Sequence, residues 1–366
     1  MRRGNVIATL AMNAALWWII CGCAQATNPA ANISCGSALS GLHPAAGSTV
    51  TLKRGCIYSG SLSIGADNVT VTAYGTGAAP VIELRQDGAA VSVYGSRDVI
   101  ENLSLVGVAP STWTCGGRQT PAGHVDGVDI YPGAADNTVS SVSATGFYAA
   151  VYVMAAAIGN VVENSTFTSN TELDSNSPSG SAGAFGVLLW GNNNTVEHNT
   201  ITDNLVCSLA YGQDGSAVEI FGGSHNSVRS NSAWDDNAFT ELGSYSGHVA
   251  TGNSYVGNTV TDGSSGSGAG GGRAGMEMTF LVTRGSLDGN GPVHTTVATD
   301  NQVTLTAPGD SGAISYAWRH GDGTLLTLTG NDLDLGSNQA LYEDGGYVDG
   351  GGNTLTGTCN PSSACS

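Results

Sequence analysis

Two glutamates in matching settings are the residues of this chain best suited to acid-base chemistry. Each stands between inward-facing residues of an alternating segment, in Ala217-Val-Glu219-Ile and in Phe239-Thr-Glu241-Leu. If these segments are adjacent parallel strands, their backbones lie about 4.8 Å apart, and two carboxylates so close cannot both ionise freely. One could protonate a leaving oxygen while the other acts as nucleophile or as base for water. We predict a catalytic pair; the alternative is a solvated or cation-bridged acid pair.

Two more acids, Asp235 and Asp236, form the corner just before the Glu241 strand. Either could hold a catalytic water or help to bind Ca²⁺, which takes several oxygen ligands. The alternative is that Asp is simply favoured at corners. We predict that Asp235 and Asp236 assist the pair, that no cofactor is required although Ca²⁺ is possible, and that there is no dedicated metal site.

A repeated phrase reveals the elements that must position these acids. It reads Asn194-Thr-Val-Glu-His-Asn199, then Asn226-Ser-Val-Arg-Ser-Asn231, then Asn253-Ser-Tyr-Val-Gly-Asn258. Self-similarity every few tens of residues signals a solenoid, and alternating apolar residues favour short strands. Asn suits the corners because it tolerates left-handed backbone and its amides can bond from turn to turn.

When the strands are aligned, each shows a small residue followed by an inward, an outward and an inward residue. The outward residue and the next outward residue along each strand predict two columns on one face. The first contains Asp129, Tyr152, Leu188, Glu219, Glu241 and then Leu281. The second contains Tyr131, Met154, Trp190, Phe221 and Gly243. Aromatic rings beside carboxylates suit sugar binding, because pyranose rings stack on aromatic faces. The alternative is that loops cover these aromatics.

Further candidates surround these columns, and long segments precede them. The segments Val108–Gly123, Thr171–Ala184, Leu205–Ser216 and Asp262–Ala274 are predicted to wall a functional cleft. Arg284 could pair with Glu241 or contact substrate, or form a structural salt bridge; the histidines could instead be polar surface. The predicted substrate-binding residues are Asp129, Asp126, His124, Tyr152, Trp190, Phe221, Arg284 and His248.

Over about residues 45–356 the chain resembles the right-handed parallel β-helix proteins of the pectate-lyase-like superfamily. His124-Val-Asp126-Gly-Val-Asp129-Ile is similar to the Asn-Thr-Asp-Gly-Ile-Asp motif of polygalacturonases, whose first aspartate is catalytic. The Asp-Asp pair of that family is absent, since Gly146-Phe-Tyr-Ala-Ala-Val stands there, and Gly247-His248-Val matches only part of its Gly-His-Gly. The resemblance implies an all-β, right-handed parallel β-helix of about ten turns with an N-terminal cap, and a carbohydrate-active protein outside the polygalacturonases.

The N-terminus has the features of a secretory signal peptide. Arg2 and Arg3 precede an apolar run, and Ala24-Gln25-Ala26 fits a cleavage site. Ile20-Cys21-Gly22-Cys23 also resembles a lipoprotein box, so anchoring through Cys23 is an alternative to release. No other stretch approaches the roughly 18 apolar residues of a membrane span. The predicted divisions are a signal peptide at 1–26, a cap at 27–60, a β-helix at 61–356 and a disulfide-clipped tail at 357–366.

The net charge and the cysteine count indicate which partners and which cellular compartment suit the chain. Without the leader the chain keeps all 29 acidic residues but only nine basic ones. A nucleic acid is therefore an improbable partner, and neutral glycans or a Ca²⁺-assisted site are favoured. Six cysteines remain, an even number typical of disulfides in an exported chain. The most economical pairing is Cys35–Cys56, Cys115–Cys207 and Cys359–Cys365.

The combined features predict a secreted, monomeric glycoside hydrolase that cleaves a polysaccharide or oligosaccharide in a groove on the β-helix. One alternative is a polysaccharide lyase, which performs Ca²⁺-assisted β-elimination. Another is a non-catalytic glycan-binding or adhesin solenoid, which needs no paired-acid centre.

Overall fold

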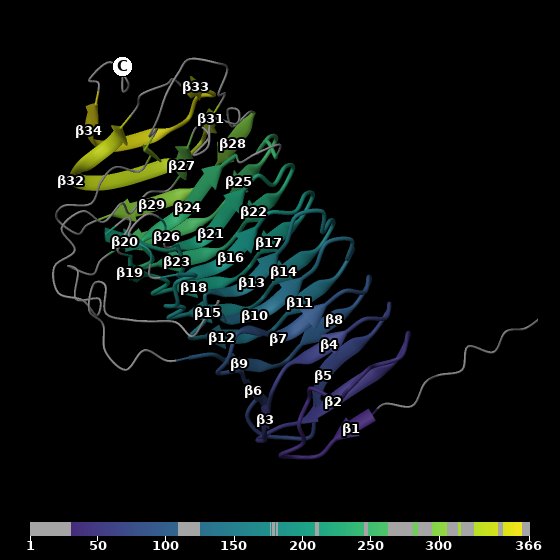
Figure 1. The fold of residues 1–366 in the computed structure, drawn as a ribbon. Helices are drawn as coiled ribbons and strands as arrows, with labels where there is room; N and C mark the ends of the chain where they lie inside the picture. The colour runs from purple at the N-terminus through teal and green to yellow at the C-terminus, as the bar shows by residue number, and fades with distance from the viewer. Residues whose placement is uncertain are drawn as a thin grey trace, which may run out of the picture.

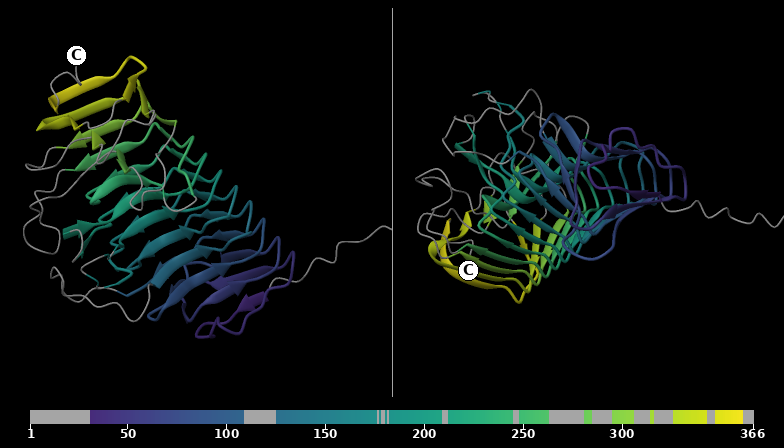
Figure 2. Two further views of the ribbon diagram at one scale, coloured as in Figure 1. Left: turned by 45° about the horizontal axis from the view of Figure 1, so that its top comes forward. Right: turned by 90° about the horizontal axis from the view of Figure 1, so that it is seen from below.

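The protein is a right-handed parallel β-helix, shown as a computed structural model in Figure 1. Residues described are 31–108, 125–175, 177, 180, 182–208, 212–244, 248–262, 281–284, 295–305, 314–315, 326–342 and 347–360. All regular elements within these ranges are strands. The views of Figure 2 show them stacked along one axis, from the N-terminal strands in purple to the C-terminal strands in yellow. The predicted fold class is confirmed.

Each turn contributes strands to three parallel stacks. The first sheet contains β4 (Leu62–Ile64), β7 (Gly88–Val93), β10 (Val125–Ile130), β13 (Ala149–Val153), β16 (Phe185–Leu189), β21 (Ser216–Phe221), β24 (Ala238–Gly243), β27 (Leu281–Arg284) and β30 (Ile314–Ser315). The second contains β1 (Ala31–Ile33), β2 (Thr49–Lys53), β5 (Thr70–Tyr74), β8 (Val99–Glu101), β11 (Thr138–Ser140), β14 (Val161–Glu163), β17 (Thr195–Glu197), β22 (Ser227–Arg229), β25 (Ser254–Val256), β28 (Thr296–Thr299), β31 (Leu326–Thr329) and β33 (Tyr347–Asp349).

The third sheet lies along the remaining side of the coil. It contains β3 (Ile57–Ser59), β6 (Val81–Glu83), β9 (Ser104–Val106), β12 (Ser143–Thr145), β15 (Thr166–Thr168), β18 (Thr200–Thr202), β23 (Ser232–Trp234), β26 (Thr259–Asp262) and β29 (Gln302–Leu305). The long strand β32 (Asp332–Tyr342) pairs with both β29 and β30, and β34 (Thr354–Asn360) pairs with β32, so the first and third sheets merge there. Outside the coil, β19 (Val206–Ser208) and β20 (Gly212–Asp214) form an antiparallel hairpin.

The inward side chains form one continuous apolar core. Val128 and Ile130 on β10, and Val218 and Ile220 on β21, are fully buried in it. Because alternate residues of a strand face opposite sides, the residues between them are directed to the outer face of the first sheet.

Stacked asparagine amides hold the corners, as the repeat predicts. In one ladder each Asn donates its amide to the next side-chain oxygen at 2.9–3.1 Å, from Asn199 through Asn231, Asn258, Asn301 and Asn331 to Asn353. A second ladder includes Asn137, Asn160, Asn194, Asn226 and Asn253. These amides satisfy backbone groups that the turns would otherwise bury without partners.

Asp98 replaces Asn at the N-terminal end of the second ladder. Its carboxyl is fully buried, and Oδ1 accepts a hydrogen bond from the Val69 amide at 2.7 Å while Oδ2 has no partner. Burial raises the pKa of Asp98 to about 6, against the opposing effect of the Val69 hydrogen bond. The carboxyl therefore binds its proton more tightly in the folded state than in the unfolded chain.

Replacing Asp98 with Asn should stabilise the protein in a pH-dependent way. Because folding raises the pKa of Asp98, the protonated carboxyl stabilises the folded state. This contribution is complete below the unfolded pKa of about 4 and is lost as the pH rises through the folded pKa of about 6. We expect Asp98→Asn to gain about 3 kcal/mol at pH 8, with the gain shrinking toward pH 4. Urea unfolding across this range measures it. The exposed Asp87→Asn is the control, and a gain independent of pH would contradict the assignment.

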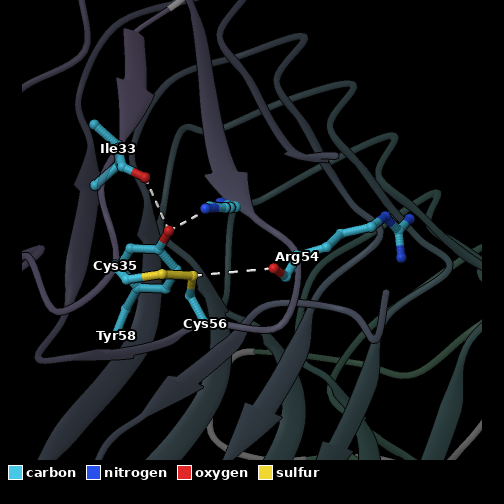
Figure 3. Close-up of a disulfide and its surroundings, with 6 residues drawn as sticks. Ile33, Cys35, Arg54, Cys56 and Tyr58 are labelled. Atoms are coloured by element: carbon cyan, nitrogen blue, oxygen red, sulfur yellow. Dashed lines mark hydrogen bonds between the residues drawn. A yellow bond between two sulfur atoms is a disulfide. The ribbon is translucent and has the colours of Figure 1, made fainter. Parts of the chain in front are cut away.

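The N-terminal disulfide is present where the spacing predicts it. Cys35 and Cys56 are bonded, with a Cα–Cα distance of 5.2 Å. Beside them Tyr58 donates its hydroxyl to the Ile33 carbonyl at 2.9 Å and accepts the Lys53 amide at 2.8 Å (Figure 3). Cys115 and Cys365 lie outside the described residues. So does the predicted signal peptide, and none of the described residues form a helix with the length and apolarity needed to cross a membrane.

Candidate functional site

The register of the first sheet brings the two glutamates together. Glu219 on β21 pairs directly with Glu241 on β24, so their backbones lie about one strand spacing, ~4.8 Å, apart. Toward the N-terminus the same column continues through Leu188 and Tyr152 to Asp129. The predicted first column is therefore correct from Asp129 to Glu241.

The two glutamates differ in their surroundings. Glu219 is only 9% exposed, and its Oε2 accepts a hydrogen bond from the Ser216 hydroxyl at 3.0 Å. Ser216 begins the same strand, so this bond fixes the Glu219 carboxyl relative to β21. Glu241 is half-buried and more open to solvent. The face therefore presents one restrained carboxyl and one more accessible carboxyl side by side.

The column departs from the prediction one strand beyond Glu241. Val282, and not Leu281, pairs with Glu241. The segment Thr279-Phe-Leu281-Val is apolar throughout the positions that set the alignment, so side-chain alternation does not fix its register. The shift places the Arg284 backbone opposite Gly243, in the second column. The Arg284 side chain lies outside the described part of the structure.

The second column contains two groups of ring contacts along the axis of the coil. Trp190 lies 5.8 Å from Tyr152 and 5.8 Å from Phe221, measured between ring centroids. Trp190 and Phe221 are partly exposed. At the N-terminal end Tyr131 stacks on Tyr94 at 4.1 Å. The sequence analysis missed Tyr94, although it follows Val93 as Tyr131 follows the equivalent Ile130.

Gly243 makes room for the end of this aromatic row. A Cβ placed on Gly243 would lie 3.0 Å from Cε2 and 3.1 Å from Cδ2 of Phe221. The Phe221 ring therefore packs over the Gly243 backbone. Because glycine has no side chain, the Phe221 ring can lie against the strand that carries Glu241.

Part of the outer face is covered by a small apolar cluster. Tyr148, Ala149, Phe185 and Leu188 are buried there, and Tyr152, Ala182 and Trp190 pack against them. Burial raises the pKa of Tyr148 well above its usual value, and the negative charges of Glu219, Asp174 and Asp126 raise it further. The Tyr148 phenol thus stays protonated near the acids of this face.

Asp126 and Asp129 form a second acidic group on β10. They are 1% and 3% exposed, and Asp126 Oδ1 accepts the Ala149 amide at 3.2 Å. Burial raises the pKa of Asp129 well above its usual value, the charge of Asp126 adds to the rise, and a hydrogen bond with Tyr131 opposes it. Asp129 lies three strands from Glu219 along the column, about 14 Å at the strand spacing, so the two groups are separate centres.

The two corner aspartates occupy different positions. Asp236 is 1% exposed and ends a short third ladder, in which Asn170 bonds to Asn204 and Asn204 bonds to Asp236 Oδ1 at 2.8 Å. Burial raises the pKa of Asp236 well above its usual value, against two hydrogen bonds from Asn204. The Asp236 carboxyl is therefore part of the corner ladder. Asp235, at a positive φ of 58°, is half-buried beside it.

The two candidate histidines are His124 and His248. His248 is exposed, and His124 lies outside the described residues. Within the described ranges, no three His, Cys, Asp or Glu side chains gather as a metal site would require.

Comparisons with known proteins show the fold. No family model and no curated protein matches the sequence. An alginate lyase from Paenibacillus sp. str. FPU-7 superposes with a TM-score of 0.57 at 14% identity, covering 88% of this chain and 98% of that chain. The tailspike protein of E. coli bacteriophage HK620, solved in complex with a pentasaccharide, gives 0.57 at 11% identity and covers 90% of this chain. The chain spans 58% of that tailspike chain.

Proposed function

We propose that the chain is a glycoside hydrolase that cleaves a polysaccharide or oligosaccharide at Glu219 and Glu241. The observation that carries the proposal is their direct pairing on adjacent strands of an outer face. Two such carboxylates resist ionising together. The restrained Glu219 is assigned as the acid that protonates the leaving glycosidic oxygen, and the more open Glu241 as the nucleophile or the base that activates water.

The aromatic row supports a sugar chain as the ligand. Tyr94, Tyr131, Trp190 and Phe221 occupy successive outward positions beside the acids, with Met154 between the two halves of the row. Flat aromatic rings can stack on the apolar face of a pyranose ring, and the neighbouring acids can accept hydrogen bonds from its hydroxyl groups. The tailspike that shares the fold was solved with a pentasaccharide, and the alginate lyase is named for a polysaccharide. Both support a carbohydrate ligand.

The proposal places the mature protein outside the cell. The Cys35–Cys56 disulfide is compatible with an oxidising compartment, and the first 26 residues have the pattern of a signal peptide. An extracellular enzyme meets polymeric glycans directly. Detection of the mature chain in culture medium, beginning near Thr27, tests this part of the proposal.

One observation favours β-elimination as the second candidate. The register places the Arg284 backbone opposite Gly243, two residues along from the Glu241–Val282 pair. A lyase needs a positive group that neutralises a uronate carboxylate, together with a base that removes the neighbouring proton. Arg284 and Glu241 are the residues that would take these roles.

One assay separates these reactions and also tests for activity. The purified protein is incubated with neutral and uronate-containing polysaccharides, and reducing ends are recorded together with the ultraviolet absorbance of unsaturated uronate. New reducing ends without that absorbance support hydrolysis. Both signals together mean elimination and overturn the hydrolase assignment. Neither signal across the panel, with glycan binding retained, would make the protein a binding solenoid.

Removing the Trp190 ring should weaken glycan binding. Trp190 contacts both Tyr152 and Phe221, and loss of a tryptophan that anchors a ligand typically costs about 2 kcal/mol, or about 30-fold in affinity. Isothermal titration with a substrate oligosaccharide measures the effect of Trp190→Ala. A small decrease in Tm is also expected, because Trp190 packs on the apolar cluster.

A matched tryptophan on another face serves as the control. Trp234 is 40% exposed on β23 of the third sheet, so Trp234→Ala should leave affinity unchanged. Equal losses in both variants, or a large loss of stability with unchanged affinity in Trp190→Ala, would assign Trp190 to packing alone.

A further inference from the structure

The second outward column continues one turn further toward the N-terminus than its rings do. β4 pairs in register with β7, and the Tyr94 amide donates to the Ile64 carbonyl at 2.8 Å. Gly65 follows Ile64, so it lies opposite Tyr94, as Tyr94 lies opposite Tyr131 on the next turn. The column therefore begins with one glycine, Gly65, and reaches a second glycine, Gly243, at its other end.

The position over Gly65 is open. No described atom comes within 4 Å of a Cβ placed on Gly65, apart from its neighbours in the chain. At the other end of the column the Phe221 ring fills the equivalent space, 3.0 Å from a Cβ placed on Gly243. The Tyr94 ring instead stacks on Tyr131, at 4.1 Å between centroids. We call the space over Gly65, next to the Tyr94 ring, the Gly65 notch.

The residues around the Gly65 notch suit a sugar ring. Tyr94 is 49% exposed although it stacks on Tyr131, so much of its ring surface remains accessible. Ser63, the outward residue of β4, is half-buried in the neighbouring first column and carries a hydroxyl group. An aromatic ring and a hydroxyl are the partners that a pyranose needs for its C–H face and its own hydroxyls. A protein partner would need a much larger surface than one exposed ring.

We propose that the Gly65 notch binds one sugar unit of the glycan, at a distal subsite. The notch lies five strands from Glu219 along the first sheet, about 24 Å at the strand spacing. A sugar unit of an extended chain advances by about 5 Å, close to that spacing, so a chain of about six units is needed to reach both places. The inference rests on the proposed function for the identity of the glycan. It predicts that long chains bind more tightly than short ones.

Filling the notch should remove this preference for long chains. Gly65→Leu puts a side chain into the open space, and neither a positive φ nor a close contact opposes it, so Tm should stay close to that of wild type. We expect about 10-fold weaker binding of chains that span the notch and the acids, which is the contribution of about one stacked ring. Shorter chains should bind as they do to wild type.

Isothermal titration measures this effect. The probes are oligosaccharides of graded length prepared from the neutral and uronate-containing polysaccharides of the panel. Ser143→Leu is the matched control, because Ser143 is exposed on β12 of the third sheet, and it should bind every length as wild type does. Tyr94→Ala should also weaken the binding of long chains, but with a lower Tm, because it removes the stack on Tyr131.

The outcomes separate the subsite from the proposed reaction. If Gly65→Leu binds long chains as tightly as wild type does, the subsite is overturned, even where the protein cleaves the glycan. If no polysaccharide is cleaved but Gly65→Leu alone loses the preference for long chains, the subsite stands and the hydrolase assignment falls. Wild-type protein that binds no chain of any length would overturn both.

Discussion

Glu219→Gln and Glu241→Gln should each lower turnover by about 10²–10⁴-fold on the substrate identified in the polysaccharide panel, because loss of a positioned acid or base typically costs that much. Glutamine keeps the shape of the side chain and can still bond to Ser216, which donates to Glu219 Oε2 at 3.0 Å. Folding and substrate affinity should therefore remain close to wild type. Turnover and Michaelis constants measured separately would show the loss in kcat.

A glutamate on another face controls for the general effect of removing a carboxylate. Glu163 lies on β14 of the second sheet and is half-buried, as Glu241 is. Glu163→Gln should retain full turnover. If both Glu219→Gln and Glu241→Gln also retain near-normal turnover, the pair is structural, and the reaction must be sought around Asp126 and Asp129.

Breaking the longer asparagine ladder should cost several kcal/mol of stability. Asn231 is 1% exposed, donates its amide to the Val196 carbonyl at 2.9 Å and to Asn258 Oδ1 at 3.1 Å, and accepts the backbone and side-chain amides of Asn199. Asn231→Ala leaves several of these buried groups unpaired, at about 1–3 kcal/mol each. We expect a loss of about 3–5 kcal/mol, large against a typical total of about 5–15 kcal/mol.

Denaturant unfolding measures this loss, and Asn193 offers a control nearby. Asn193 is exposed in the preceding turn with a positive φ of 57°, a conformation that glycine adopts freely. Asn193→Gly should change stability little. An Asn231→Ala protein as stable as wild type would show that water or relaxed backbone replaces the ladder amides.

The sequence was sufficient to predict the architecture and the column of acids. The phrase around Asn199, Asn231 and Asn258 repeats with little change, so it determines both the strands and the corner that each amide occupies. Glu219 and Glu241 lie between residues of alternating character, and this alternation fixes their register. Both features are local consequences of a period-two strand inside a longer repeat.

Other positions needed the three-dimensional structure. Leu281 was misplaced because an apolar run carries no alternation. The ladder position of Asp236 could have been predicted from the repeat. Asp236 follows Asn231 at the same spacing as Asn204 follows Asn199, and Asn204 is a ladder residue. The sequence of β10 does not predict that Asp126 and Asp129 are buried, because their burial depends on the residues that pack against the outer face.

The residues that hold the coil together are different from the residues that its outer face presents to a ligand. A turn of the coil needs an apolar residue directed inward and an amide at the corner, and it leaves the outward columns free to change. Substitution at these outward positions can therefore exchange one ligand for another while the coil persists. Chains with different outward residues can therefore share the coil, and this chain shares it with solved structures at 11–14% identity.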